Sequence, residues 1–185
     1  MIVRFLKTDE RRYAVTVVTD QGEEMSMPTG PGSDPLMPHD LQHLIVEQEF
    51  GWKHAIFGQL ALGGDAGTFH KQKTGLSKRQ LSRQRRAEKK KSSSLASLGA
   101  EESARSERAT YICLHRWMKA SSHKRLNERA AEIEDSIESA LKFMDKDERA
   151  LYTPARLDGV VAKMNSLSER WVSTPVGSHM DIVWE

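Results

Sequence analysis

The chain has 185 residues, of which 38% are hydrophobic and 29% are charged, so it can fold around a core of its own. A formal net charge of +2 excludes a uniformly basic or acidic protein, and a single cysteine excludes an intrachain disulfide. No run approaches the roughly 18 apolar residues of a membrane span, and the N-terminus lacks a stretch of signal-peptide length, so we expect a cytoplasmic protein without a membrane partner.

The start of the chain predicts a small antiparallel sheet. β-Branched and aromatic residues are dense at 2–6 and 13–19, and 24–27 continues the pattern as a third strand. Gly22 can supply the positive φ of the turn before the third strand. Residues 180–184 alternate enough to be a final strand, which by its position could pair with this N-terminal meander.

Helical periodicity follows an irregular crossover at 28–38, which holds four prolines and two glycines. Apolar residues recur at steps of three or four in five segments. These segments are 38–50, 52–62, 106–119, 126–144 and 154–171. The sequence therefore predicts a single α+β domain over 1–185, in which the small sheet packs against about five helices. We expect the seam of 126–144 to pack against 157–171, although it could also serve a partner helix or a second copy.

Residues 70–105 differ in composition from the rest of the chain. Ten Lys or Arg and one acid, Glu88, lie between Lys71 and Lys91, and three serines follow at 92–94. No sustained apolar face runs through this segment. We therefore expect a basic, Ser-rich flexible insertion or linker, with at most a transient helix over 77–90.

Residues 38–47, Pro-His-Asp-Leu-Gln-His-Leu-Ile-Val-Glu, combine a helix start with side chains that bind metals. At about 100° per residue, His39, His43 and Glu47 fall on one side of the helix, one turn apart and away from the apolar stripe. Imidazoles at i and i+4 have Cβ atoms roughly 5–6 Å apart and can share one Zn²⁺ or another divalent ion. Glu47 is a candidate third ligand.

Other polar residues could complete this site. Asp40 could orient an imidazole by accepting its ring N–H, and the helix turn could bring His54 or Asp65 toward the histidines. A catalytic zinc requires three protein ligands and an open position. If the protein is an enzyme, these ligand types favour metal-assisted hydrolysis or lyase chemistry. Alternatively, both histidines are ordinary residues that hydrogen-bond locally near a helix start.

The motif Pro-His-Asp-Leu-x-His-x-x-Val-Glu at 38–47, followed by Phe-Gly, resembles a group of short bacterial proteins, notably actinobacterial ones. Their C-termini similarly end in an amphipathic helix, Arg-Trp and Pro-Val-Gly, as at 170–171 and 175–177. This resemblance implies no particular activity. His-Asp-Leu-Gln-His at 39–43 is also similar to the H-D-x-x-H motif of a ubiquinone-biosynthesis family, which implies zinc. A later glutamate of that motif corresponds here to Ala55, with His54 and Gln59 nearby.

The basic stretch supports a function of another class, a non-catalytic binding or adaptor protein. Its cations could contact several phosphates of a nucleic acid with steep salt dependence. They are Lys78, Arg79, Arg83, Arg85, Arg86, Lys89, Lys90 and Lys91. No aromatic residue lies between Lys71 and Lys91, so stacking on single-stranded bases is not expected. A solvated linker is the simpler interpretation. The segment could also lie against the acidic stretch at 128–138, and helix 126–144 could serve a protein partner.

The single cysteine and the tryptophans are expected in the core. Cys113 lies in an apolar helical stretch, which favours a small buried side chain over a nucleophile. All four tryptophans fall at or near apolar stripes. They are Trp52, Trp117, Trp171 and Trp184.

Overall fold

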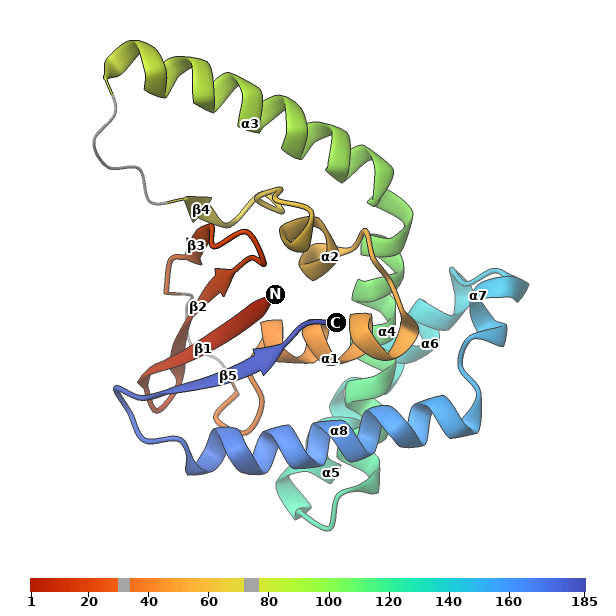
Figure 1. Ribbon diagram of the computed structural model, residues 1–185. Helices are drawn as coiled ribbons and strands as arrows, with labels where there is room; N and C mark the ends of the chain where they lie inside the picture. Colours follow the sequence, from red (N-terminus) through yellow and green to blue (C-terminus); the bar gives the residue numbers. More distant parts are fainter. Residues whose placement is uncertain (30–33, 72–76) are drawn as a thin grey trace.

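The computed structural model describes residues 1–29, 34–71 and 77–185, so parts of the expected crossover (30–33) and linker (72–76) lie outside it. A five-stranded antiparallel sheet is joined to a layer of helices, which confirms the α+β class (Figure 1). The strands are β1 (Ile2–Asp9), β2 (Arg12–Val18), β3 (Glu24–Met27), β4 (His70–Lys71) and β5 (His179–Val183). The helices are α1 (His39–Phe50), α2 (Ile56–Ala61), α3 (Lys78–Leu98), α4 (Ala100–Ala120), α5 (Lys124–Glu132), α6 (Glu134–Lys142), α7 (Lys146–Ala150) and α8 (Pro154–Ser173).

The strand order is β4-β3-β2-β1-β5, and all neighbouring strands are antiparallel. The expected pairing of the last strand with the N-terminal meander is confirmed, since Val3 pairs with Ile182 and Phe5 with Met180. Every second residue in the middle of β1 and β2 is buried, as expected for a sheet with one face on the core. β4 was not expected, because its two residues are too few to form a pattern.

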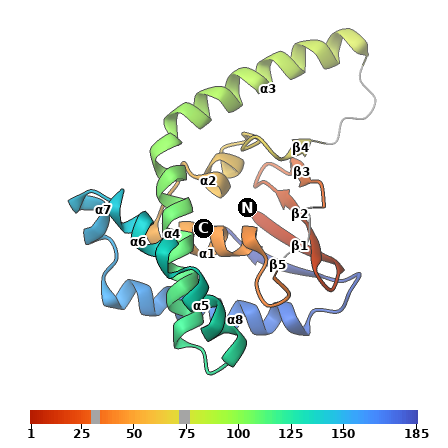
Figure 2. The ribbon, with the colours of Figure 1, turned by 180° about the vertical axis from the view of Figure 1, so that it is seen from behind.

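Helix α1 lies at the centre of the helical layer, in contact with α2, α4 and α8 (Figure 2). It follows Pro38 and ends at Gly51, whose φ of 70° gives the left-handed cap that favours glycine. Every residue from Leu41 to Glu47 is buried. The helix therefore buries its polar side as well as its apolar stripe, because neighbouring helices enclose it.

Helix α4 organises the C-terminal half, because α1, α5, α6 and α8 all contact it. The structure corrects the predicted helix 126–144 in two ways. The helix divides at Ile133 into α5 and α6. Both parts pack on α4, whereas α8 was the expected neighbour. The divided helix, the short α7 and α3 raise the helix number to eight in the described part of the chain, compared with about five expected.

Most of the segment expected as an insertion or linker is helical, because α3 and the start of α4 cover it. A capping box begins α3: the Gln80 backbone N–H donates to the Ser77 hydroxyl, and the Ser77 backbone N–H donates to the Gln80 side chain. Lys, Arg, Gln, Ala and Leu then favour a helix without tertiary packing. No residue of α3 is buried, which agrees with the missing apolar face. Gly99 follows α3. A Cβ at this position would lie 1.8 Å from the carbonyl oxygen of His54, so the close approach of the two backbones requires glycine.

The tryptophans and the cysteine are core residues, as expected. All four tryptophans are buried, and Cys113 is fully enclosed. Burial raises the pKa of the Cys113 thiol to about 12. Across the described residues, no helix combines the length and the apolar character needed to cross a bilayer.

Candidate metal centre

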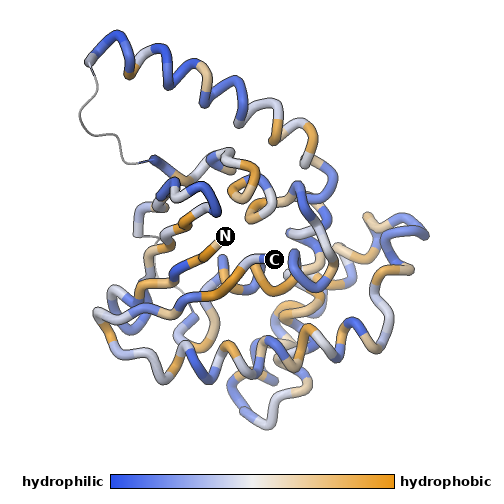
Figure 3. The backbone as a smooth tube through the Cα atoms, viewed as in Figure 1, coloured by the Kyte–Doolittle hydropathy of each residue, from blue (hydrophilic) through white to orange (hydrophobic). Residues whose placement is uncertain are grey.

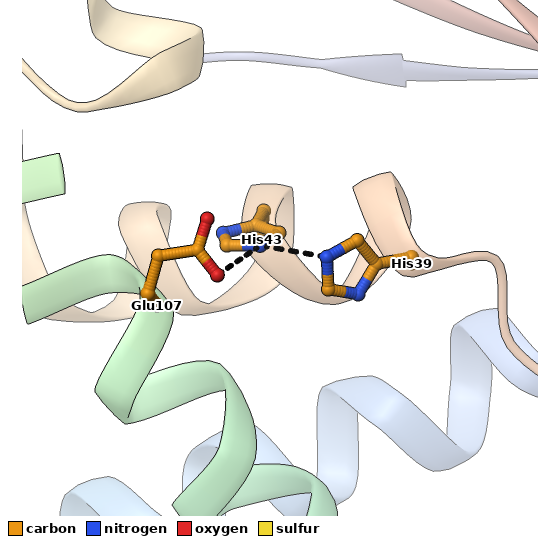
Figure 4. A group of neighbouring side chains, drawn as sticks. All are labelled: His39, His43 and Glu107. Atoms are coloured by element: carbon orange, nitrogen blue, oxygen red, sulfur yellow. Dashed lines mark hydrogen bonds and ion pairs between the residues drawn. The ribbon is translucent and has the colours of Figure 1, made fainter. Parts of the chain in front are cut away.

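Two imidazoles and one carboxylate meet where α1 contacts α4 (Figure 4). Nε2 of His43 lies 3.2 Å from Nε2 of His39 and 3.6 Å from Oε2 of Glu107. Ligand atoms of all three residues lie within 4.8 Å of one another. The two histidines lie one turn apart on α1, as the sequence predicts, and α4 supplies the carboxylate. This group could hold a metal ion.

The three side chains differ in their exposure to solvent. The side chain of His43 is 1% exposed, that of Glu107 is 57% exposed, and His39 is exposed. The two rings stand nearly perpendicular, with centroids 4.7 Å apart. The group therefore has one buried inner member and two outer members that solvent can reach.

A hydrogen-bonded relay lies behind the inner histidine. Oγ of Ser106 donates to Oε1 of Glu47 over 2.9 Å and lies 2.8 Å from Nδ1 of His43. A hydroxyl has one proton, so while Glu47 is ionised Ser106 donates that proton to the carboxylate, and the Ser106 oxygen accepts the Nδ1–H of His43. This tautomer leaves the lone pair of Nε2 facing His39 and Glu107, as a metal ligand requires.

The environment of His43 also favours its neutral form. Burial, and then the charge of His39, lower the pKa of His43 to about 3. The ring is therefore uncharged at neutral pH. A neutral imidazole is the form that binds metals, so protons compete little for this nitrogen.

Glu47 does not join the two histidines at the Nε2 side. Its carboxylate is fully buried and accepts the backbone N–H groups of Ile56 (3.2 Å) and Phe57 (2.8 Å), besides the Ser106 hydroxyl. It lies 4.0 Å from Nδ1 of His43, on the side of the ring away from His39. Burial raises the pKa of Glu47 to about 8, against the effect of these three donors. Glu47 thus ties α1 to the start of α2, and Glu107 is the carboxylate that lies with the two histidines.

The other expected residues also lie apart from the group of ligand atoms. Asp40 accepts a hydrogen bond from the Tyr13 hydroxyl on β2. His54 contacts Glu102, with Nδ1 3.3 Å from Oε1. Asp65 accepts a backbone N–H within its own turn. Within the described ranges, none of the three belongs to the cluster that could hold an ion.

Sequence reasoning missed Ser106 and Glu107. Glu107 is one of several acids along α4 and carries no distinguishing pattern. Ser106 and Thr110 did carry a signal, because they lie on the same helix face as Cys113 and Trp117, and all four are buried. Polar residues within an apolar stripe need partners, and here His43 is that partner: Oγ1 of Thr110 lies 3.4 Å from its Nδ1.

The basic residues expected to bind nucleic acid lie on α3, away from the metal-ligand group. A cleft of about 650 Å³ runs between α3 and the loop that leads from α2 to β4, and it contains none of His39, His43 and Glu107. The structure therefore separates the two candidate sites.

Comparisons of the chain with protein-family models, with curated proteins and with solved structures gave no match. The geometry of His39, His43 and Glu107 is therefore the basis for assigning a function.

Proposed function

We propose that this protein binds one divalent transition-metal ion, of which Zn²⁺ is the expected example, through His39, His43 and Glu107. The spacing of the ligand atoms carries the proposal: Nε2 of His43 is 3.2 Å from that of His39 and 3.6 Å from Oε2 of Glu107. Zinc binds nitrogen and carboxylate oxygen at about 2.0–2.2 Å, and a tetrahedron with such bonds separates its ligand atoms by roughly 3.3 Å.

The competing explanation is a hydrogen bond without metal, in which Nε2–H of His39 donates to Nε2 of His43. It accounts for the contact between the rings, but it gives Glu107 no partner on the neutral ring of His43. An exposed carboxylate gains little free energy from lying beside a neutral ring. A cation among the three atoms would use the lone pair of His43 and the charge of Glu107 together.

The proposed coordination leaves room for chemistry. Three protein ligands leave one position of a tetrahedral ion for water or substrate, as in catalytic zinc sites. His39 and Glu107 are exposed, so solvent can reach that position. Glu107 also lines a hollow of about 430 Å³ with Tyr111 and Asp135, where a substrate could lie. The reaction class that this arrangement supports is metal-assisted hydrolysis, for which the ion supplies an activated water.

We also infer that the protein acts in the bacterial cytoplasm. Cys113 is the one cysteine of the chain and is buried as a free thiol, which suits a reducing compartment. The resemblance of the motif at 38–47 to bacterial proteins supports the same setting.

Metal binding is tested with untagged, full-length protein that has been stripped with a chelator. The stripped protein is titrated with Zn²⁺ by calorimetry and with Co²⁺ by absorption spectroscopy. We expect one equivalent of either metal. His39→Gln and Glu107→Gln should each weaken binding at least about tenfold, because each removes one of three ligands.

His70→Gln and Glu138→Gln are the matched controls, since both residues are exposed and lie outside the ligand group. All four substitutions change exposed positions, so none should threaten the fold. Equal binding by all four variants would place the ion elsewhere. Absence of binding at micromolar Zn²⁺ would refute the proposal and favour the hydrogen-bonded pair.

A further inference from the structure

Helix α3 runs along the outside of the molecule, and its N-terminal part stands away from the other helices (Figures 1 and 2). It has 21 residues, none of them buried, and it contacts α2 and the adjoining α4. Its half-buried residues recur along one face that turns toward the body. They are Leu81, Gln84, Glu88, Ser92 and Leu95. The rest of α3 faces solvent.

The exposed part of α3 is strongly basic. The eight Lys and Arg of α3, expected from the sequence as a nucleic-acid contact, are all exposed. Figure 3 shows the hydrophilic character of the free part of this helix. Four cations at steps of four, three and four residues lie opposite the half-buried face and form an outer stripe. They are Arg79, Arg83, Arg86 and Lys90.

Acidic side chains of the protein do not neutralise these cations. In the parts of the chain that the structure describes, none of the eight forms an ion pair, whereas arginines elsewhere pair with acids, as in Arg108–Glu148 and Arg116–Asp158. Outside α3 the chain has 20 basic and 25 acidic residues. The excess of positive charge therefore lies on α3, where it is available to an outside partner.

We propose that α3 binds B-form duplex DNA by laying its outer stripe against the phosphates that border the major groove. A helix of 21 residues is about 31 Å long, and the major groove, about 12 Å wide, admits an α-helix. Contacts to phosphates by Lys and Arg are independent of base sequence. The inferred activity is therefore sequence-independent DNA binding, separate from the metal site.

Other polyanionic partners fit α3 less well. Single strands are bound through stacking on aromatic side chains, and α3 has none. The major groove of A-form RNA is too deep and narrow to admit the helix. Helices that bind membrane surfaces bury a broad apolar face, whereas the apolar side chains of α3 are few and its inner face is turned toward the protein.

The test uses the full chain and a fluorescent duplex of about 25 base pairs, which is longer than the helix. Anisotropy titrations run from about 50 to 200 mM salt. The stripe variant carries Arg79→Gln, Arg83→Gln, Arg86→Gln and Lys90→Gln, and glutamine keeps the helix propensity close to that of the replaced residues. We expect its affinity at the lowest salt to fall at least about tenfold, and the slope of log K against log[salt] to fall by about 3 to 4.

A control variant removes the same charge from other exposed positions that form no ion pair in the described structure. Its substitutions are Arg12→Gln, Arg125→Gln, Lys142→Gln and Lys146→Gln. DNA binding that this variant keeps and the stripe variant loses supports the proposal, provided that circular dichroism shows equal helix content. Equal loss in both variants, or no binding at low salt, overturns it. Tighter binding to duplex RNA, or to vesicles with anionic lipid, would also overturn it in favour of that partner.

Discussion

Nδ1 of His43 lies 2.8 Å from Oγ of Ser106, and this contact determines which ring nitrogen faces the candidate metal position. Ser106 in turn donates to Glu47. Two residues, Glu47 on α1 and Ser106 on α4, thereby hold the imidazole of His43 in the tautomer and orientation that a metal ligand needs. Partners of this kind influence metal affinity without touching the ion.

Ser106→Ala should weaken both the proposed metal site and the fold. It removes the nearer acceptor of the His43 Nδ1–H, so that only Oγ1 of Thr110 at 3.4 Å remains, and it removes one of three donors to Glu47. We expect the affinity for Zn²⁺ to fall about 10–100-fold and the free energy of unfolding to fall by about 1–3 kcal/mol. Calorimetric titration and urea denaturation measure the two effects.

Ser168→Ala is the matched control for Ser106→Ala. Ser168 is also a buried serine, and its hydroxyl donates to the carbonyl of Leu36 over 2.9 Å, without a link to the histidines. It should lose comparable stability and keep full affinity for Zn²⁺. Unchanged affinity in Ser106→Ala would show that the relay does not tune the site.

Local patterns predicted much of the fold because its elements carry their own signals. The β-branched and aromatic residues at 2–6 and the apolar repeat over 154–171 depend only on neighbours along the chain, and the strand and the helix that they predict are both confirmed. The break at Ile133 could not be predicted, since the apolar repeat continues through it and packing on α4 decides where the helix divides. Only a transient helix was expected over 77–90, because no apolar face runs through this stretch, whereas the capping box and helix propensity of α3 extend it from Lys78 to Leu98.

The sequence predicted only the part of the candidate site that lies on a single helix. His39 and His43 are brought together because a helical turn fixes their spacing. Glu47 shares their side of the helix but turns to backbone N–H groups of the next segment. Glu107 lies on α4, far along the chain from the two histidines. A single sequence holds no information on that tertiary contact.

Cys113 should contribute to stability in a pH-dependent way. Burial raises the pKa of its thiol from 9.0 to about 12, so the folded protein disfavours the thiolate. The contribution is complete below about pH 9 and is lost as the pH rises from about 9 toward 12. Between pH 8 and about 10.5, wild type should lose about 2 kcal/mol more unfolding free energy than Cys113→Ala. Tyr13 and Tyr152 also have raised pKa values, but both variants retain them. Equal losses measured by urea denaturation would contradict this account.

The ion pair between Arg108 and Glu148 should stabilise the attachment of α7 to α4. Nε and Nη2 of Arg108 lie 2.9 and 2.6 Å from the two carboxylate oxygens, and the Glu148 side chain is only 2% exposed. Glu148→Ala leaves a half-buried guanidinium without its partner and should cost about 3 kcal/mol. Arg116–Asp158 is an exposed pair of the same chemistry, so Asp158→Ala should cost less than about 1 kcal/mol. Similar costs for both substitutions in urea denaturation would show that burial of the pair is unimportant.

Trp184 should hold the two ends of the chain together. Its backbone N–H donates to the carbonyl of Met1 over 2.9 Å, and its buried ring lies against Phe57 with centroids 5.9 Å apart. Trp184→Ala removes a large buried side chain beside the sheet and α2, so we expect it to lower the free energy of unfolding by about 3–5 kcal/mol. Val183→Ala is the control, because Val183 is 58% exposed and should change stability by no more than about 0.5 kcal/mol. Chemical denaturation of both variants measures the difference. A small effect at Trp184 would mean that its side chain adds little to the packing of the chain end against α2.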